Sequence, residues 1–227
     1  MDRHDLDSGA FWERCIAEMV EQGLPDGWRK SVFDGEVALA DAFVGALPKG
    51  ADVLDFGCGV GRNALALARK GFNMLVCDVA DAGVRFCEEW AADQGLGIHS
   101  VAFDGHEIEL ANASVDGILA WSCLDHVTLA WARELAGELG RVARPGAILL
   151  VSFDEDRSDD PESVSEVLED GSHHYVEGRR AGMIFRPYTN DEVLGLFEDD
   201  WERLGFEGAD TSVPRRGLFQ RRRTGRS

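Results

Sequence analysis

The sequence predicts a doubly wound α/β fold, with a mostly parallel sheet, one antiparallel late strand and helices on both faces. Two observations lead to this prediction. Apolar runs of strand length alternate with helical segments between residues 51 and 153, which is the pattern of right-handed βαβ units. A glycine-rich turn at residues 57–61 separates the first of these strands from the helix after it. The 227 residues suffice for one such domain with additional segments.

The predicted elements alternate regularly up to residue 153. Residues 10–48 are expected to form two helices, because apolar residues recur at helical spacing and the sequence GLPDGW interrupts them. Asp81 is expected to cap the second helix of the alternating region. Five strands are predicted at 51–57, 73–80, 98–104, 115–122 and 147–153, and the helices between them at 61–71, 81–95 and 129–143.

The regular alternation stops after residue 153. Residues 154–182 are acidic and serine-rich, which predicts a loop with at most one short helix, and a long insertion after a strand usually lines a site. Later elements are an added strand in 182–188, a helix opened by Thr189 or Asn190, and late strands within 203–213 and 217–223. We therefore expect one domain made of a helical cap (1–48), a ligand-binding core (49–153), a substrate-side insertion (154–190) and a C-terminal helix with strands (191–227).

The composition limits the classes of partner. The formal net charge is −19, and an acidic protein repels nucleic acid and anionic membranes. The arginine-rich end, residues 215–227, is either a local basic patch or a solvated terminus. The start of the chain shows no secretory signal, no apolar run approaches the roughly 20 residues of a membrane-spanning helix, and the five cysteines lack metal-binding spacing. These features predict a soluble cytoplasmic protein, monomer or homodimer, with reduced cysteines and a small-molecule substrate.

The stretch VLDFGCGVGRNA, residues 53–64, carries the strongest functional signal. Glycines after a strand let a ligand approach the main chain, and the next helix adds free N–H groups. Dinucleotides and S-adenosylmethionine both use such turns. Here Asp55 precedes the glycines, and the spacing departs from the dinucleotide pattern G-x-G-x-x-G. Because a carboxylate repels a pyrophosphate and suits an ammonium group, S-adenosylmethionine is favoured, with an NAD(P)-dependent oxidoreductase as the alternative.

On these residues the chain resembles the class I S-adenosylmethionine-dependent methyltransferases of small-molecule type, over roughly residues 50–153. The resemblance implies a Rossmann-like fold, S-adenosylmethionine as cofactor and S-adenosylhomocysteine as product. It also implies methyl transfer to an oxygen, nitrogen or carbon atom of a small molecule. A methyltransferase-like protein that holds the ligand without transferring a methyl group is a second interpretation.

The resemblance further implies which residues contact the cofactor. Asp78, at the end of the second strand, matches the acid that binds both ribose hydroxyls. Val79 matches the residue against the adenine, and Asp104 with Gly105 match the positions that read the adenine edge. The complete implied set is Asp55, Phe56, Gly57, Cys58, Gly59, Gly61, Asn63, Asp78, Val79, Asp104, Gly105 and Trp121.

Candidates on the substrate side are weaker. His126, after the fourth strand, is either a general base or a structural histidine. Arg186 pairs either with a substrate acid or with a nearby carboxylate, and Trp12 either closes over the site or packs on the sheet. The polar-aromatic cluster in the insertion either faces the substrate or lies on the surface; it consists of His173, His174 and Tyr175. The acids match no metal-binding positions at strand ends, so no metal site is predicted.

Overall fold

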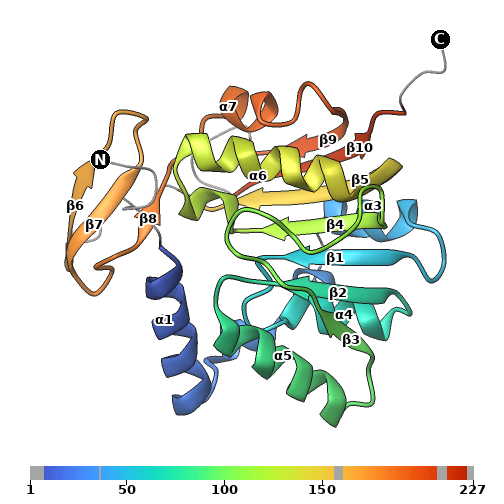
Figure 1. The fold of residues 1–227 in the computed structure, drawn as a ribbon, viewed down its shortest axis with the longest axis horizontal. Coiled ribbons are helices and arrows are strands. Elements are labelled where there is room, and N and C mark those ends of the chain that lie inside the picture. Colours follow the sequence, from blue (N-terminus) through green and yellow to red (C-terminus); the bar gives the residue numbers. More distant parts are fainter. Residues whose placement is uncertain (1–7, 36, 156–160, 209–213, 224–227) are drawn as a thin grey trace.

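The computed structural model describes residues 8–35, 37–155, 161–208 and 214–223. At its centre is a seven-stranded sheet with strand order β3-β2-β1-β4-β5-β10-β9 (Figure 1). The strands are β1 (Asp52–Phe56), β2 (Asn73–Cys77), β3 (Ile98–Ser100), β4 (Val115–Trp121), β5 (Ala143–Phe153), β9 (Trp201–Glu207) and β10 (Arg215–Arg221). Strands β1 to β5 pair in parallel, whereas β10 is antiparallel to both of its neighbours. The predicted fold class is confirmed.

Helices cover both faces of this sheet. One apolar core joins α3, α4 and α5 to the strands, and a second core on the opposite face joins α6 and the segment around α7 to them. On α6 the buried residues Ala132, Leu135 and Leu139 recur at helical spacing, which explains why this segment is a helix with one face on the sheet. The helices are α1 (Gly9–Gln22), α2 (Asp26–Arg29), α3 (Ala38–Ala46), α4 (Arg62–Arg69), α5 (Asp81–Asp93), α6 (Leu129–Val142) and α7 (Asn190–Gly195), with 3₁₀ turns η2 (Val32–Asp34) and η3 (Leu124–His126). Within the described ranges, none of them is long and apolar enough to cross a membrane.

The strand order places the functional edge of the sheet. Strand β1 pairs with β2 on one side and with β4 on the other, both in parallel. Their carboxyl ends, Phe56, Cys77 and Trp121, therefore meet at one edge of the sheet. The chain order reverses between β1 and β4, and ligands of open α/β sheets bind in the crevice outside such a reversal.

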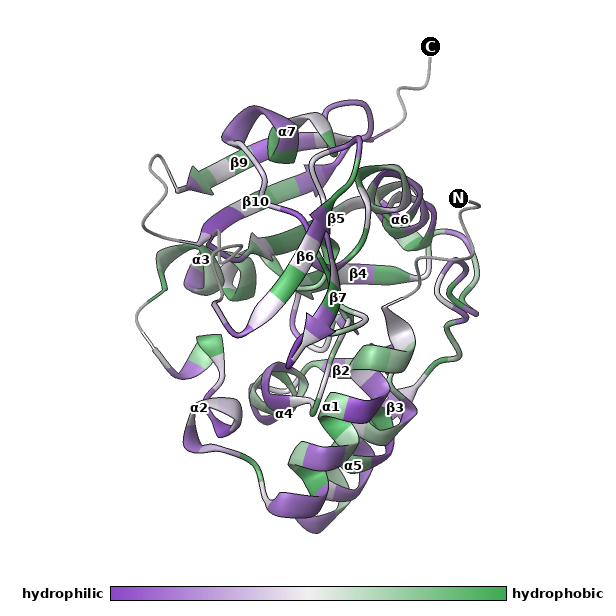
Figure 2. Ribbon diagram, turned by 90° about the vertical axis from the view of Figure 1, so that its left-hand side faces the viewer, coloured by the Kyte–Doolittle hydropathy of each residue, from purple (hydrophilic) through white to green (hydrophobic). Residues whose placement is uncertain are grey.

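The insertion differs from the prediction. Instead of a loop with one short helix, it forms a separate antiparallel sheet of β6 (Ser163–Val167), β7 (His173–Gly178) and β8 (Ile184–Phe185). In Figure 1 this small sheet stands beside the main sheet, next to the start of α1. All residues of β6 are at least partly exposed, and its two valines are mixed with the polar residues Ser163, Ser165 and Glu166 (Figure 2). A strand without a continuous apolar face gives little periodic signal, which is why the sequence predicts a loop here. The strand expected in 182–188 is β8 and belongs to this small sheet.

Of two predicted helix caps, one is confirmed and the other is wrong. Thr189 caps α7 as expected, and Glu192 completes a capping box with it. Asp81 is the first residue of α5 and not its cap, because the cap position is Ala80, which makes no side-chain hydrogen bond. The N–H of Ala82 in that first turn donates instead to Glu13 of α1, over 3.0 Å. A carboxylate supplied by another helix is not visible in the local sequence.

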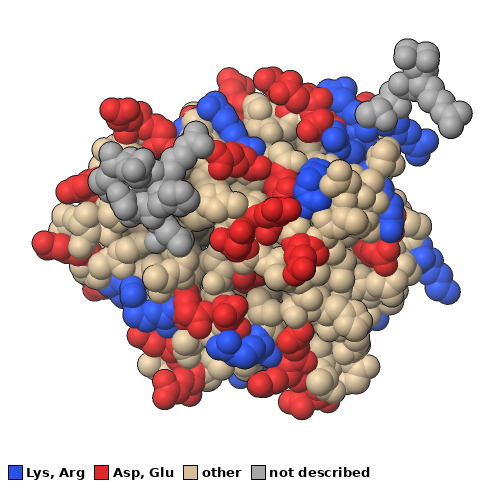
Figure 3. Space-filling model, in the orientation of Figure 1, with Lys and Arg blue, Asp and Glu red and all other residues tan. Residues whose placement is uncertain are grey.

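The arginine-rich end is not a solvated terminus over its described part. Residues 215–221 form β10, which lies inside the main sheet between β5 and β9. Arg216 pairs with Glu207 at 3.3 Å, and Arg221 pairs with Asp200 at 2.6 Å. These arginines therefore neutralise acids of the same domain. Elsewhere the face shown in Figure 3 carries scattered acidic side chains.

Candidate active site

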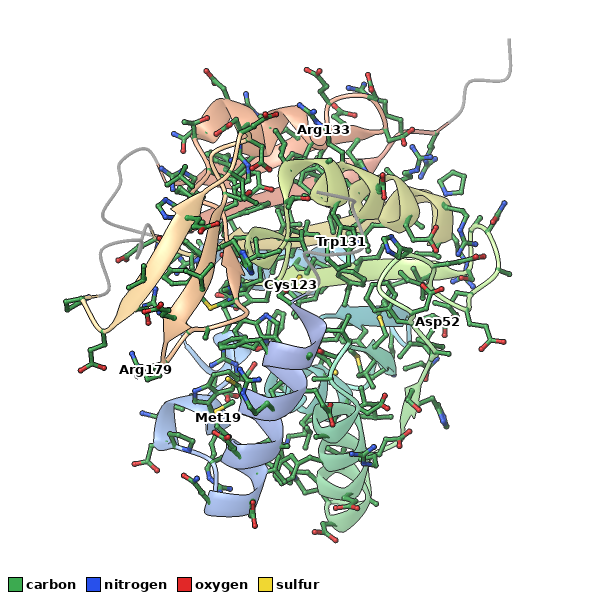
Figure 4. The ribbon with its side chains drawn as sticks, turned by 60° about the vertical axis from the view of Figure 1, so that its left-hand side comes forward. Met19, Asp52, Cys123, Trp131, Arg133 and Arg179 are labelled. Atoms are coloured by element: carbon green, nitrogen blue, oxygen red, sulfur yellow. The ribbon has the colours of Figure 1, made fainter. Side chains whose placement is uncertain are left out.

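A cavity of about 710 Å³ lies at the carboxyl ends of β1, β2 and β4. The strand ends form its floor, the first turns of α1 form one wall, and residues around β8 form another. Figure 4 labels two of its lining residues, Cys123 after β4 and Trp131 on α6, near the place where α1, α6 and the sheet meet. The predicted site residues that line the cavity are Trp12, Phe56, Gly57, Cys58, Gly59, Asn63, Asp78, Val79, Gly105, Trp121 and His126. Its size and partly apolar walls suit a small ligand.

The three glycines of the turn have different reasons to lack a side chain. All three have positive φ angles, 70° at Gly57, 53° at Gly59 and 81° at Gly61, which glycine adopts most easily. A Cβ at Gly57 would lie 2.6 Å from Cys123, and a Cβ at Gly61 would lie 2.1 Å from the sulfur of Cys87. At Gly59 the nearest atom would be 3.9 Å away, on Trp28. Gly57 and Gly61 are therefore glycines because neighbouring side chains leave no room for a Cβ. Gly59 is the glycine that leaves open space above the main chain.

Asp55 lies beneath this turn and does not line the cavity. Its side chain is 1% exposed, and one carboxyl oxygen, Oδ2, has no hydrogen-bond partner. Burial raises the pKa of Asp55 to about 7, against the effect of a hydrogen bond from the backbone N–H of Ala64 in the first turn of α4. The predicted direct contact with a cofactor is not supported by this position. The carboxyl group instead supports the turn and the start of α4 from below.

Asp78 occupies the cavity wall at the end of β2. One carboxylate oxygen accepts a hydrogen bond from the N–H of Gly59 at 2.7 Å, and the other accepts one from Ala80 at 2.9 Å. Burial raises the pKa of Asp78, while these backbone hydrogen bonds lower it and the charge of Glu13 raises it further. The side chain thus joins the second strand to the glycine turn, and a carboxylate can still accept hydrogen bonds from ligand hydroxyls with its remaining lone pairs.

On the opposite side of the floor, Gly105 lines the cavity but Asp104 does not. The Asp104 carboxylate is exposed and accepts the N–H groups of His106 and Glu107 at 2.9 and 2.8 Å. The indole N–H of Trp131 donates to the carbonyl of Gly105 at 2.7 Å. Asp104 therefore shapes the turn that presents Gly105, whereas Trp131 forms a wall. The sequence contains no signal for Trp131, because it comes from α6, 26 residues further along.

His126 lies where the cavity meets α1 and the small sheet. Its Nδ1 is 3.2 Å from the carbonyl oxygen of Ile184, and because a carbonyl only accepts, Nδ1 carries the proton in this contact. In the neutral ring Nε2 is then the proton acceptor. The ring centroid of Trp12 lies 4.6 Å away, edge to face, and that of Phe185 lies 5.8 Å away. The contact with Ile184 gives His126 a structural role, and an acceptor at Nε2 would let the same ring act as a base.

Helix α1 closes one side of the cavity. The hydroxyl of Ser8 donates to the carbonyl of His126 at 2.9 Å, and Trp12 follows one turn later on the cavity wall. Phe11 packs with the apolar residues of the small sheet, and Glu13 binds the start of α5. Of the two alternatives for this helix, the structure therefore favours the one in which it covers the site.

The other substrate-side candidates lie outside the cavity walls. Tyr175 is fully buried under Phe11, and His173 contacts Ser165 at 3.1 Å. His174 also belongs to β7. Arg186 is 4% exposed and binds Glu192 at 2.6 Å. These four residues hold the small sheet together or attach it, and their positions do not support direct substrate contact. Lining residues that the sequence pattern did not indicate include Arg62, Asp154, Arg180 and Met183.

Comparisons with known proteins agree with this geometry. Residues 53–146 match a family model described as a methyltransferase domain. The chain is 30% identical over 101 residues to a ubiquinone biosynthesis O-methyltransferase of Parvibaculum lavamentivorans. It is 33% identical over 105 residues to an S-adenosyl-L-methionine-dependent Diels-Alderase of Talaromyces variabilis. Each match covers 44% of this chain but only 38% and 35% of those relatives, respectively, so the chain spans less than two fifths of their length.

A solved structure extends the similarity over nearly the whole chain. It is the 1,6-didemethyltoxoflavin-N1-methyltransferase of Burkholderia thailandensis, with bound 1,6-didemethyltoxoflavin and S-adenosylhomocysteine. The TM-score is 0.69 at 18% identity, and the match covers 98% of this chain and 92% of the other. At this identity the likeness concerns the fold, including its additions before β1 and after β5.

Proposed function

We infer that the chain belongs to the class I S-adenosylmethionine-dependent methyltransferases, and we propose that it methylates an oxygen, nitrogen or carbon atom of a small molecule. S-adenosylmethionine would lie across the carboxyl ends of β1, β2 and β4, and S-adenosylhomocysteine would be the product. The observation that carries the proposal is the open surface of Gly59 beside the carboxylate of Asp78, inside one cavity.

The residues present fit this cofactor. Gly59 lets an extended ligand pass close to the main chain, and Asp78 offers carboxylate oxygens to paired hydroxyls. Aromatic rings line the cavity at several points, and the faces of Trp12, Trp121 and Trp131 are suited to a flat base or a sulfonium. The Asp-x-Gly-x-Gly-x-Gly spacing departs from the dinucleotide pattern G-x-G-x-x-G, which disfavours NAD(P).

A small-molecule substrate is supported by the enclosure of the cavity. Helix α1 and the small sheet stand over it, which leaves little room for a polymer. The relatives named for ubiquinone biosynthesis and for didemethyltoxoflavin point in the same direction. The insertion supplies Met183 and Phe185 to the wall beside His126, so this part of the chain would select the substrate.

When bound, the cofactor supplies the activated methyl group. The chain then has to hold the acceptor in line with that group and to exclude water. Trp12 and Phe185 would position a flat acceptor beside His126. Where the acceptor is a hydroxyl or an ammonium group, the Nε2 atom of His126 would take its proton, since the contact with Ile184 holds the proton on Nδ1.

Two measurements test the proposal. Calorimetric titration with S-adenosylhomocysteine should give saturable binding, with NADH as the matched control ligand. Binding of NADH alone would overturn the proposal in favour of an oxidoreductase. Incubation with methyl-labelled S-adenosylmethionine and a metabolite extract should give a labelled product.

One comparison favours a second function, in which the chain binds S-adenosylmethionine but transfers no methyl group. The Talaromyces relative is named as an S-adenosyl-L-methionine-dependent Diels-Alderase, so a similar sequence can bear a name other than methyltransferase. Binding of S-adenosylhomocysteine without any labelled product over a broad range of acceptors would favour this reading, in which the ligand is held but no methyl group is transferred.

A further inference from the structure

An arginine of the insertion lines the cavity on the side where the acceptor would lie. Arg180 belongs to the turn between β7 and β8, and it shares the cavity wall with Met183 and Phe185. The residue before it, Arg179, has an exposed side chain that lies 3.9 Å from Glu162, and Figure 4 labels it at the small sheet. These two adjacent arginines therefore differ in their surroundings, and of the pair it is Arg180 that forms part of the cavity wall.

The turn holds the backbone of Arg180 in place. Its carbonyl accepts the N–H of Met183 at 2.8 Å, and its own N–H donates to the hydroxyl of Ser163 in β6 at 3.3 Å. Arg14 of α1 donates to the carbonyl of Ala181 at 3.1 Å, which attaches the turn to the helix that covers the cavity. The backbone position of Arg180 is thus set by β6 and α1 before any ligand binds.

The guanidinium group of Arg180 is supported as well. Its Nη1 donates to the hydroxyl of Tyr175 at 3.0 Å, and the group lies 5.3 Å from the centre of the Tyr175 ring. Tyr175 is fully buried, so it is a rigid support. A guanidinium has five N–H donors in a planar fork, and it can therefore bind Tyr175 and a carboxylate at the same time. A side chain held in this way loses less conformational freedom when a ligand binds.

The charge of Arg180 indicates which ligands it can attract. The chain has 42 acidic and 23 basic residues, yet Arg180 is the charged lining residue that the described part of the small sheet and its turns supplies. Under the proposed function, the cofactor brings its positive sulfonium into the same cavity. Both positive charges attract an anionic acceptor and repel a cationic one, and they act in a partly apolar space where solvent screens charges less than in bulk water.

We propose that the acceptor molecule carries a carboxylate, and that Arg180 binds this carboxylate through paired N–H groups. The proposal rests on the proposed methyltransferase function and names its substrate class. A flat acid would lie with its ring beside Trp12 and Phe185 and with its carboxylate at the turn of Arg180. The sequence pattern does not indicate this role, because Arg179 and Arg180 are adjacent arginines in a polar segment.

Two ligands of the same shape and different charge test the proposal. Cinnamate and its uncharged amide, cinnamamide, are titrated by calorimetry into the chain saturated with S-adenosylhomocysteine. We expect cinnamate to bind at least ~10-fold more tightly, because hydrogen bonds between charged groups are the stronger ones. Arg180→Gln should remove this preference. Arg180→Lys keeps the charge but loses the planar fork, and it should reduce the preference. Arg179→Gln is the matched control and should retain the full preference.

The charge of the product gives an independent measurement. The labelled product formed from the metabolite extract should be retained on an anion-exchange resin at neutral pH and released when its carboxylate is protonated. An uncharged or cationic labelled product would overturn the proposal.

The binding measurements can overturn the proposal in other ways. Equal affinity for cinnamate and cinnamamide would do so, as would the absence of saturable cinnamate binding up to millimolar concentration. An unchanged preference in Arg180→Gln would assign the carboxylate to another residue, and if this variant does not fold, an unchanged preference in Arg180→Lys decides in the same sense. Lost affinity for S-adenosylhomocysteine in Arg180→Gln would assign Arg180 to the carboxylate of the cofactor. Binding of S-adenosylhomocysteine to the parent chain is measured separately, so failure of the carboxylate preference does not count against the proposed methyltransferase function.

Discussion

The carboxylate of Asp78 accepts a hydrogen bond from the backbone N–H of Gly59 over 2.7 Å, and so ties the end of β2 to the turn that follows β1. One side chain thus both shapes the glycine turn and lines the cavity. A ligand that contacts Asp78 is therefore coupled to the conformation of the turn, and the two residues act as one binding element.

Asp78→Asn should weaken binding of S-adenosylhomocysteine at least ~10-fold, because hydrogen bonds to a charged group contribute about 1.5–3 kcal/mol each. Isothermal titration calorimetry measures the affinity. Asp104→Asn is the matched control, because the Asp104 carboxylate lies outside the cavity and likewise accepts hydrogen bonds from backbone N–H groups. Equal losses in both variants would mean that Asp78 has no special role in binding.

Gly59→Ala and Gly61→Ala should have different effects. At Gly61 the new methyl group meets the Cys87 sulfur at 2.1 Å, so overpacking adds about 1–3 kcal/mol to the strain of a positive φ. Gly59→Ala adds only the strain, about 1–2 kcal/mol, but places a methyl group in the cavity. Urea unfolding should show Gly61→Ala as the less stable variant, and calorimetry should show lost ligand affinity for Gly59→Ala. The combined Gly61→Ala, Cys87→Ala chain should recover part of the stability.

Asp55 should make stability depend on pH. Its folded-state pKa of about 7 lies above the usual value of 3.8, so the native chain binds the proton more tightly than the unfolded chain. The contribution of this tighter proton binding to the free energy of unfolding is complete below about pH 4. It is lost as the pH rises to about 7, at up to about 1.4 kcal/mol per pH unit. The Asp55→Asn variant has no carboxyl group to ionise at this position. The difference between its free energy of unfolding and that of the parent chain should therefore increase in favour of the variant between pH 5 and pH 8. Parallel curves in urea unfolding at pH 5, 6, 7 and 8 would contradict the assignment.

Arg186→Met should destabilise the chain and leave ligand binding intact. Arg186 is buried with Glu192 at 2.6 Å and Asp170 at 4.0 Å, and removing one partner of a buried ion pair costs roughly 3 kcal/mol. Because both acids are partly exposed, we expect a somewhat smaller loss of unfolding free energy. Arg179→Met, on an exposed side chain of the small sheet, should stay within about 0.5 kcal/mol of the parent chain. A change in S-adenosylhomocysteine affinity for Arg186→Met would place Arg186 in the site after all.

Local sequence patterns are sufficient to predict which segments form the floor of the cavity. The glycine turn and Asp78 lie at the ends of strands whose apolar runs are visible in the sequence, so their meeting follows from the parallel sheet. The roles within that set were less visible. Asp55 and Gly61 belong to the Asp-x-Gly-x-Gly-x-Gly pattern but face the interior. The pattern indicates where the backbone makes a tight turn, and it does not indicate which atoms contact the ligand.

The walls of the cavity depend on contacts between distant segments. Trp131 reaches Gly105 from α6, and Asp154 meets Asp125 across two strands. Strands β6 and β7 expose Val164, Val167 and Val176 among polar residues, so neither strand has one continuous apolar face. The apolar cover of Tyr175 includes Phe11 of α1, from a distant part of the sequence. Such pairings leave no periodic pattern in either segment, and for that reason the sequence alone predicts a loop for the insertion.

At η3 the small sheet and the residue after it contribute backbone atoms to the contact with the core, in addition to the side-chain contacts of Phe11 with Tyr175 and of Arg186 with Glu192. The N–H of Arg186 donates to the carbonyl of Asp125 at 2.7 Å, and the carbonyl of Ile184 meets His126. Backbone contacts of this kind do not depend on the identity of the side chains. Sequences that keep the apolar contact with Phe11 could therefore be grafted between residues 163 and 185 while the glycine turn stays intact. Substrate preference could then diverge through exchange of this one segment.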